Sequence, residues 1–267
     1  MEMTSRRREP MSPTADGSGI RAVSRAWQVL RAFTPERMSL TLTDLVRDTG
    51  LPRTTVLRLV ETLAGEGLVE SGRDGRVRVG TSLIAFAAFA DTAWTVPPAS
   101  LARMRALAAE TGETVSLYVR EGTGRVVVGQ APSPNTLRHV VEPGDVLTMS
   151  AGSAAYVLLS LEPPEERELL FARIAAESDG DAEALRAGTE AAAERGWCVT
   201  HGEREPGNSG LAVPVPFPDG PAPARPPVLA VGGPTVRFTE DKIPGFVLAV
   251  RRCAEDIART GLPPALY

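Results

Sequence analysis

A group of arginine and threonine residues in the first quarter of the chain has the types and the spacing that contact nucleic acid: Arg53, Thr54, Thr55 and Arg58. An arginine can bind guanine through two hydrogen bonds, and a threonine can contact a phosphate or a thymine methyl group. At about 100° per residue, Thr54, Thr55 and Arg58 fall on one side of a helix that starts at Arg53. Most polar helix faces are simply solvated. Whether this face contacts nucleic acid or only solvent must therefore be judged from the neighbouring elements.

The helix that would carry these residues has an apolar opposite side. Its apolar arc holds six residues, which are Val56, Leu57, Leu59, Val60, Leu63 and Ala64. Leu51-Pro52 supplies the start, because proline is tolerated in the first turn of a helix. A shorter helix is expected before it, with Thr41 or Thr43 as its cap, and Gly50 permits the left-handed turn that ends it. Two helices joined by such a tight turn predict a helix-turn-helix.

A β-hairpin is expected directly after the second helix. The helical pattern breaks at Gly65 and Gly67, and two short strands follow at residues 68–70 and 77–79, joined by an Asp-Gly turn. The hairpin carries three arginines that can contact the DNA backbone, which are Arg73, Arg76 and Arg78. Residues 41–79 therefore predict a winged helix-turn-helix whose second helix contacts bases and whose wing contacts phosphates.

Length and charge suit a DNA-binding domain followed by a domain with another role. The 267 residues carry a net charge of −4, but residues 1–80 hold 13 Lys/Arg against 10 Asp/Glu, and the remainder holds 16 against 23. A mildly basic front and an acidic remainder are typical of this division. No apolar run approaches the roughly 20 residues of a membrane span. Two cysteines far apart, Cys198 and Cys253, indicate a reducing compartment, so a cytoplasmic protein is expected.

Other chemistries have weaker support. A metal site would have to be built from the cluster Cys198, His201, Glu203 and Glu205. This cluster lacks a second thiolate or imidazole, whereas structural zinc needs four ligands, so no metal and no cofactor is expected. Nucleotide-binding and hydrolase fingerprints are absent, and Ser153 and Ser209 lie beside glycines without a usable base. A hydrolase is a distant alternative, and the chain is expected not to be an enzyme.

The chain divides into four segments. Residues 1–17 have no apolar period and predict a disordered tail. Residues 18–80 form the winged helix-turn-helix domain, and residues 81–96 a linker helix that is apolar nearly all round. This apolar surface favours packing against a second subunit, although burial within the same chain accounts for it equally well. Residues 97–267 form the last domain.

That domain mixes helices and strands. Helices are expected at residues 99–111, 151–160, 164–176, 181–195 and from Thr239 to about Arg259. Strands are expected at residues 114–120, 125–130, 137–141, 197–200, 210–215 and 228–232, with a Pro/Ala-rich hairpin at 218–227. The order predicts an α+β domain with one central sheet.

From about residue 18 to residue 260 the chain resembles the IclR family of bacterial transcription regulators. In the front half the resemblance rests on the first helix, on LPRTTVLRLVETLAGEGLVE and on the hairpin. In the back half it rests on TMSAGSAAYVLLS (148–160), GWCVTHGEREPGNSGLAVPV (196–215) and VGGPTVRFTEDKI (231–243). It implies an α+β fold with an N-terminal winged helix-turn-helix domain, a linker helix and a C-terminal GAF-like effector-binding domain. It also implies homodimers, or dimers of dimers, that bind double-stranded operator DNA and sense a small molecule. Paired winged heads predict a pseudo-palindromic operator.

The resemblance places an effector pocket in the C-terminal domain, lined by Met149, Ser153, Ala154, Thr200, Gly210, Ala230 and Gly232. Relatives that bind small carboxylates have an acidic residue in place of Thr200, a cysteine or serine in place of Gly210, and serines in place of the last two residues. Fewer hydroxyl donors and more space predict a larger or more apolar ligand, or a vestigial pocket in a ligand-independent DNA-binding protein. A ligand would act by favouring one arrangement of the dimer, and the linker helix would carry that preference to the recognition helices. Repression and activation stay open alternatives.

Overall fold

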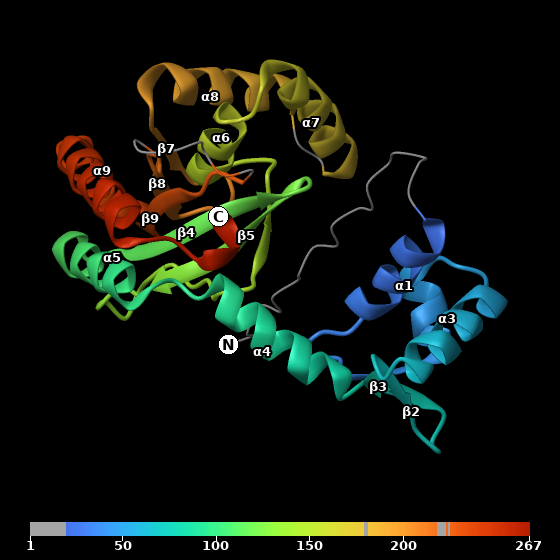
Figure 1. Cartoon of the computed structure of the whole chain (residues 1–267). Coiled ribbons are helices and arrows are strands. Elements are labelled where there is room, and N and C mark those ends of the chain that lie inside the picture. The colour runs from blue at the N-terminus through green and yellow to red at the C-terminus, as the bar shows by residue number, and fades with distance from the viewer. Residues whose placement is uncertain (1–19, 179–180, 218–222, 224) are drawn as a thin grey trace. The chain divides into compact units, whose positions relative to one another are not determined.

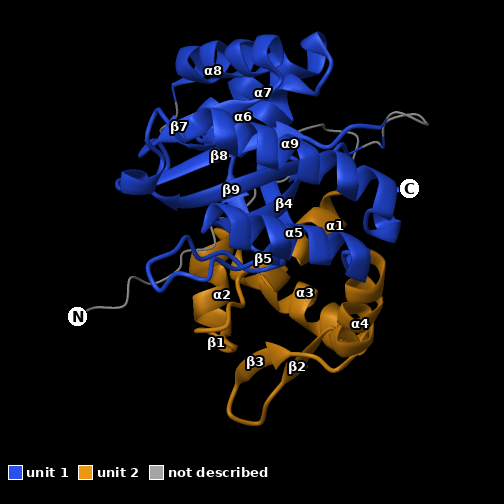
Figure 2. Cartoon of the chain, turned by 90° about the vertical axis from the view of Figure 1, so that its left-hand side faces the viewer, with its two compact units in different colours: residues 1–12, 94–267 blue, residues 13–93 orange. Residues whose placement is uncertain are grey.

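The computed structural model describes residues 20–178, 181–217, 223 and 225–267. The expected tail (residues 1–17) and part of the expected hairpin (218–227) lie outside the described residues. The chain forms two compact units, unit 2 ending at Ala93 and unit 1 continuing from Trp94 to the C-terminus (Figure 2).

Unit 2 is built on a bundle of three helices. They are α1 (Arg21–Arg31), α2 (Leu42–Thr49) and α3 (Arg53–Gly65) (Figure 1). Their shared core is formed by Val29, Leu40, Leu45, Val56, Val60, Leu63, Val69 and Val77. Leu57 was expected on the buried side of α3 but is 44% exposed. Its position only about 40° around the helix from Arg53 explains this, because the core reaches only the middle of the apolar arc.

The ends of α2 follow their local sequence. The Thr41 hydroxyl accepts a hydrogen bond from the Asp44 N–H (3.1 Å), and the Asp44 carboxylate accepts one from the Thr41 N–H (3.0 Å). This capping box satisfies backbone groups that the first turn leaves without partners. At the other end Gly50 adopts a φ of 65°, a left-handed conformation that favours glycine. The expected turn between α2 and α3 is thereby confirmed.

A small antiparallel sheet completes unit 2. Strands β2 (Val69–Ser71) and β3 (Arg76–Val79) form the expected hairpin, which extends away from the helices (Figure 1). A third strand, β1 (Ser39–Thr41), pairs with the other edge of β3. The sequence did not predict β1, because three residues show no usable alternation and their strand conformation depends on a partner distant in the chain.

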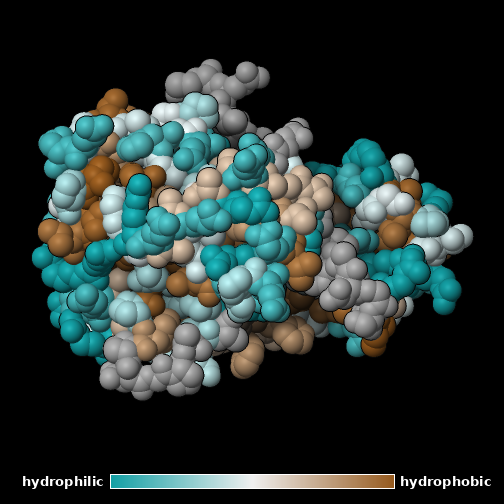
Figure 3. All heavy atoms as spheres, turned by 90° about the horizontal axis from the view of Figure 1, so that it is seen from above, coloured by the Kyte–Doolittle hydropathy of each residue, from teal (hydrophilic) through white to brown (hydrophobic). Residues whose placement is uncertain are grey.

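Helix α4 (Ser82–Trp94) follows the hairpin and corresponds to the expected linker helix. None of its residues is buried, and Ile84, Phe86 and Phe89 are between 65% and 75% exposed. Val23 and Trp27 on α1 and its N-cap residue, Ile20, are also exposed. Hydrophobic residues (brown) reach the surface among hydrophilic ones (teal) in Figure 3.

Unit 1 is one antiparallel sheet between two layers of helices. Its strands are β4 (Thr114–Glu121), β5 (Gly124–Ala131), β6 (Val146–Thr148), β7 (Cys198–His201), β8 (Asn208–Pro214) and β9 (Val228–Pro234), in the order β6-β5-β4-β9-β8-β7. Helices α5 (Pro98–Thr111) and α9 (Ile243–Thr260) pack on one face (Figure 1). Helix α6 (Ser153–Ser160) packs on the other face, with α7 (Pro164–Glu177) and α8 (Ala182–Arg195) outside it. The short helices η1 (Thr235–Arg237) and η2 (Pro264–Leu266) complete the unit.

Strand alternation divides the interior of unit 1 into two cores. On β4, Val115, Leu117 and Val119 join the core beneath α5 and α9, while Tyr118 joins the core beneath α6. A β-bulge between Leu117 and Tyr118 shifts the pairing with β5 by one residue. Away from this bulge, every second residue of a strand faces α6, whereas on β5 the bulge turns both Val128 and Ala131 towards the core beneath α5 and α9.

Two expected elements differ from the structure. The expected strand at residues 137–141 does not form, and β6 occupies the sheet edge instead. Carbonyl groups of that segment accept side-chain hydrogen bonds rather than ladder bonds, His139 O from Thr114 Oγ1 (2.8 Å) and Val141 O from Gln130 Nε2 (2.5 Å). The last helix starts at Ile243 and not at Thr239, because Pro244 has no N–H with which to continue the ladder backwards.

Candidate functional site

The polar side of α3 lies open to solvent. Arg53, Thr54 and Arg58 are exposed, and Thr55 is partly buried. Neither Arg53 nor Arg58 forms a hydrogen bond or an ion pair through its side chain with any described residue, so both guanidinium groups can bind a ligand. Pro52 is the N-cap rather than a residue of the first turn, which places Arg53 at the start of the helix. The positive end of the helix dipole adds to the attraction for phosphate.

The three wing arginines have different surroundings. Arg78 forms an ion pair with Asp74 (Nη2 to Oδ2, 2.5 Å), and hydrogen bonds from Arg78 and from the Arg76 backbone hold the pKa of Asp74 at about 2. Arg76 donates from Nε to Ser39 Oγ on β1 (3.2 Å). Arg73 is exposed at the tip of the hairpin and has no side-chain partner among the described residues. Arg73 can therefore bind an anion without breaking another contact, whereas the charge of Arg78 is already balanced by Asp74.

Unit 1 contains a cavity of about 50 Å³ beneath the N-terminus of α6. The strand register brings its walls together, because Thr200 pairs with Gly210, Gly210 with Gly232, and Gly232 with Thr114. Residues paired in this way on neighbouring strands point to the same face of the sheet. From the opposite side, the Ser153 N–H donates to Thr200 Oγ1 (3.1 Å) and joins α6 to β7.

Six of the seven residues expected to bind an effector line this cavity, and they are Ser153, Ala154, Thr200, Gly210, Ala230 and Gly232. Met149 is fully buried in the core beneath α6 and is not among the lining residues. The sequence missed several polar lining residues, which are Ser116, Tyr118, Arg125, His139, Arg204, Asn208 and Ser209. The cavity is consequently far more polar than the expectation of an apolar or vestigial pocket.

The glycines of the cavity do not create empty space. A Cβ atom at Gly210 would lie 2.9 Å from Ser153 Oγ, and one at Gly232 would lie 3.1 Å from His139 Cδ2. The glycines admit these two side chains, which fill the volume that a serine or cysteine would otherwise take. The expectation of a larger ligand, which assumed open space at these positions, is therefore not supported by the geometry.

Arg125 is a buried guanidinium in the cavity wall. It is 3% exposed, and its Nη1 donates to Thr148 O (2.6 Å) and Ala151 O (3.3 Å). Its Nε has no hydrogen-bond partner, and no described carboxylate pairs with it. Burial lowers the pKa of Arg125 to about 10, and the charge of Arg204 acts in the same direction. A sequence signal existed, since Arg125 lies two residues before Val127 and shares its inward-facing side of β5.

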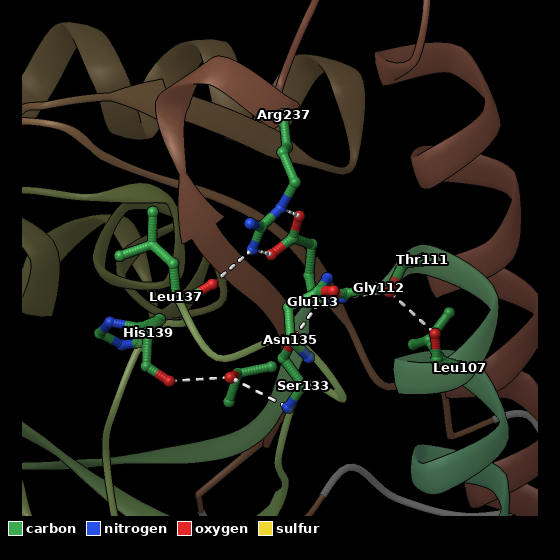
Figure 4. A network of polar contacts seen from close by, with 10 residues as sticks. Leu107, Thr111, Gly112, Glu113, Ser133, Asn135, Leu137, His139 and Arg237 are labelled. Atoms are coloured by element: carbon green, nitrogen blue, oxygen red, sulfur yellow. Dashed lines mark hydrogen bonds and ion pairs between the residues drawn. The ribbon is translucent and has the colours of Figure 1, made fainter.

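His139 is held in the cavity wall by a polar network (Figure 4). Thr114 Oγ1 donates to His139 O, Ser133 Oγ donates to Gly112 O (2.6 Å), and Arg237 Nη2 donates to Leu137 O (3.0 Å). Desolvation, together with the charges of the two cavity arginines, lowers the pKa of His139 to about 3, so the ring is neutral at neutral pH. The Asn208 amide nitrogen can only donate to His139 Nδ1 (3.1 Å), which leaves the ring proton on Nε2.

Arg237 in this network is neutralised by a buried carboxylate. It forms two hydrogen bonds with Glu113, at 2.5 Å and 2.7 Å, and Glu113 is fully buried. Figure 4 shows the two planar groups facing each other. The pair joins η1 to the start of β4 and to the loop that carries His139.

Ser209 has a histidine neighbour that the sequence did not reveal. Pairing of β7 with β8 brings His201 Nδ1 to 3.0 Å from Ser209 Oγ. Ser209 in turn donates to Thr235 Oγ1 (2.9 Å), so the histidine donates to the serine and does not remove its proton. His201 therefore lies beside Ser209, but the direction of these hydrogen bonds does not make the serine a nucleophile.

Cys198 is not a thiolate at neutral pH. Burial and the nearby Glu203 raise its pKa to about 12. Within the part of the chain that the structure describes, no three His, Cys, Asp or Glu side chains converge on a common point. In that same part, no helix combines the length and the apolar character needed to cross a bilayer.

Two family models match the chain. The model of the IclR helix-turn-helix domain matches residues 22–73, and the model of the C-terminal region of the bacterial transcriptional regulator IclR matches residues 95–259. The helix-turn-helix match lies within unit 2, and the C-terminal match lies within unit 1.

Individual proteins are similar over nearly the same span. The HTH-type transcriptional regulator KipR of Bacillus subtilis is 27% identical over 226 residues, which cover 83% of this chain and 89% of that protein. A solved IclR-family regulator from Rhodococcus sp. is 38% identical with a TM-score of 0.60, covering 97% of this chain and all of the other. An IclR homolog from Microbacterium hydrocarbonoxydans, solved with 4-hydroxybenzoate, has a TM-score of 0.68 at 23% identity, covering 90% and 98% of the two chains. The last likeness is one of fold.

Proposed function

The chain belongs to the IclR family of bacterial transcriptional regulators, and from this premise we propose how its own residues carry out that function. It binds operator DNA through the polar side of α3 and the β2–β3 hairpin, and a small molecule in the cavity of unit 1 modulates that binding. The observation that carries the proposal is the open face of α3, where Arg53 and Arg58 have no partner among the described residues.

Base recognition is assigned to α3 and backbone contact to the wing. Arg58 lies one turn into the helix beside Thr54 and Thr55, at the positions from which a recognition helix reaches base edges. Arg73 at the tip of the hairpin contacts a phosphate, and Arg76 adds a contact from its site beside Ser39. Arg78 contributes less, because binding DNA would first require it to leave Asp74.

A homodimer is proposed from the exposed apolar surface of α4. Ile84, Phe86 and Phe89 form too large an apolar surface for a free helix in water, and a second copy of the chain is the partner proposed to cover it. Two heads in a two-fold dimer recognise a pseudo-palindrome with half-sites separated by helical turns of DNA. Dimers of dimers extend the same arrangement to two operators.

The chain is proposed not to be an enzyme. The Ser209 hydroxyl is buried and donates to Thr235, so His201 cannot act on it as a general base without a rearrangement. A regulator must also share a compartment with the chromosome, which supports the expected cytoplasmic location.

Genomic footprinting of the full chain, followed by binding measurements on the recovered DNA, tests this function. We expect a pseudo-palindromic sequence that binds at least about 1,000-fold more tightly than random DNA of equal length. Equal affinity for both DNAs would leave the chain a non-specific binder and overturn the proposal. A specific operator whose affinity responds to no small molecule would favour the ligand-independent alternative.

A further inference from the structure

We propose that Arg125 is the residue that determines which effectors bind, and that the effector is a short, non-aromatic molecule whose oxyanion group neutralises this buried guanidinium. The inference rests on the proposed function, since it names the ligand class of the same cavity. It follows from the contacts of Arg125, from the charges around the cavity and from the cavity's size.

The contacts of Arg125 are incomplete. Its guanidinium donates only to the carbonyl groups of Thr148 and Ala151, and Nε has no acceptor although it is buried. A buried cation normally has a carboxylate partner, because transfer of an uncompensated charge from water is very unfavourable. Two partly buried arginines follow that rule, Arg120 of β4 with Glu162 and Arg237 of η1 with Glu113. Arg125 is more deeply buried than either, has no such partner and lines a cavity.

The rest of the cavity wall also favours an anion. Arg204 lines it, and none of the described lining residues is acidic. The first turn of α6 points at the cavity with Gly152, Ser153 and Ala154, and a helix N-terminus attracts negative charge. Arg204 is 3.5 Å from Glu205, a carboxylate that is itself largely exposed, so it retains attraction for a ligand.

Two neutral groups can hold the rest of such a ligand. Ser116 Oγ is buried in the cavity wall without a hydrogen-bond partner, as Nε of Arg125 is. His139 is neutral and carries its proton on Nε2, so it adds a donor without adding charge. Where buried polar groups have no hydrogen-bond partner in the protein, a ligand or a water molecule usually provides that partner. A hydroxyl or carbonyl group next to the oxyanion would match both.

The cavity volume limits the ligand's size. About 50 Å³ corresponds to roughly four water positions at about 10–15 Å³ each. A carboxylate with one or two further carbon atoms, or a single phosphate ion, fits this volume, whereas an aromatic acid does not. Glycines at 210 and 232 do not enlarge it, because Ser153 and His139 occupy the space beside them.

Calorimetric titration of the full chain with matched acids and amides tests the assignment. The probes are acetate, glycolate and malonate, the corresponding amides, inorganic phosphate and benzoate, each at up to millimolar concentration. We expect at least one short carboxylate or phosphate to bind. The compound that binds shows whether the oxyanion is a carboxylate or a phosphate. The amides and benzoate should not bind measurably. In Arg125→Met the Kd should rise at least about tenfold, the loss expected for hydrogen bonds to a charged group.

Two further variants make the outcome decisive. Arg125→Lys keeps a charge and should lose less affinity than Arg125→Met, which also shows that the cavity still folds. Arg120→Met removes an arginine of the same sheet that is paired with Glu162, and it should leave the Kd unchanged.

Several results would overturn the proposal. They are equal binding of acid and amide, binding of benzoate as tight as that of the short acids, an unchanged Kd in Arg125→Met, and binding of none of the anions to the wild-type chain. Operator affinity measured on the same preparation separates the two proposals. An intact operator affinity beside any of these results would refute the anion site and leave the DNA-binding function standing.

Discussion

Removal of the Arg125 guanidinium should have little effect on the stability of unit 1, whereas removal of the Arg237 guanidinium should be strongly destabilising. Arg125 lies on β5 and Arg237 on η1, both in unit 1, and methionine retains much of the volume of either side chain. Their charges are balanced differently, because Arg237 faces the carboxylate of the fully buried Glu113 and Arg125 faces only two carbonyl groups. The contrast between Arg125→Met and Arg237→Met therefore isolates the effect of an uncompensated charge.

The size of each effect follows from the structure. A pKa near 10 for Arg125, against an ordinary value of 12.5, means that its charge costs about 3 kcal/mol in the folded state. Arg125→Met removes this cost but also removes the hydrogen bonds to Thr148 O and Ala151 O, which are worth about 1.5–3 kcal/mol. The two contributions largely offset each other, so the free energy of unfolding should change by no more than about 1.5 kcal/mol. Arg237→Met leaves the fully buried Glu113 without its partner, and removal of one member of a buried ion pair should cost about 3–5 kcal/mol.

Urea unfolding in a Trp27→Phe background is the assay. This background removes the tryptophan of unit 2 and leaves Trp94 and Trp197 as reporters of unit 1. Circular dichroism recorded in parallel shows whether the two units unfold together, which decides whether a two-state free energy applies. A loss in Arg125→Met as large as that in Arg237→Met would mean that the charge of Arg125 is already compensated within unit 1 and needs no ligand to balance it.

The other predictions concern DNA binding and pH. Arg58→Ala should weaken operator binding by about 1–3 kcal/mol and random-DNA binding much less; equal losses in fluorescence anisotropy titrations would remove Arg58 from base recognition. Arg73→Ala should flatten the dependence of log K on log salt by about one unit, and Arg78→Ala should flatten it less because Arg78 is paired with Asp74. Equal slopes in the two variants would contradict these roles. The depressed pKa of His139, about 3 against 6.5, means that the unfolded state binds the proton first, so stability is complete above pH 6.5 and falls towards pH 3 by at most about 1.4 kcal/mol per unit. His139→Gln should remove this contribution in urea unfolding between pH 5 and pH 7, and an unchanged slope would show that the ring is protonated in the folded chain.

Local patterns explain what the sequence could predict. The recognition helix, the capping box at Thr41 and the turn at Gly50 depend on residues within one or two helical turns of one another. Their periodicity and turn chemistry are therefore readable in the chain itself. The same holds for the Asp-Gly hairpin of the wing.

Non-local pairing explains what the sequence missed. Strand β1 forms because β3 offers it an edge, and residues 137–141 stay irregular because Thr114 and Gln130 take up their carbonyl groups. The charges of the cavity were missed for a similar reason. Alternation with Val127 could have placed Arg125 on the inward-facing side of β5, but only the strand register and the approach of α6 place it in a cavity.

The sequence also could not distinguish the three wing arginines from one another. Three arginines on a hairpin look equivalent in sequence, yet each has its own surroundings. Asp74 lies four residues before Arg78 and pairs with it across the turn, while Ser39 reaches Arg76 only through the unpredicted strand β1. Which arginine can bind phosphate therefore depends on the fold.

The proposed regulation requires that a small molecule in unit 1 changes the affinity of unit 2 for a specific operator. The most direct test is the Kd of the full chain for its footprinted operator and for random DNA, measured at one salt concentration with and without a short carboxylate that binds the cavity. We expect the ligand to change the operator Kd by about 5-fold to 150-fold in one direction, the usual range of such coupling, and to change random-DNA affinity much less. An operator Kd that is the same with the cavity empty and saturated would contradict it.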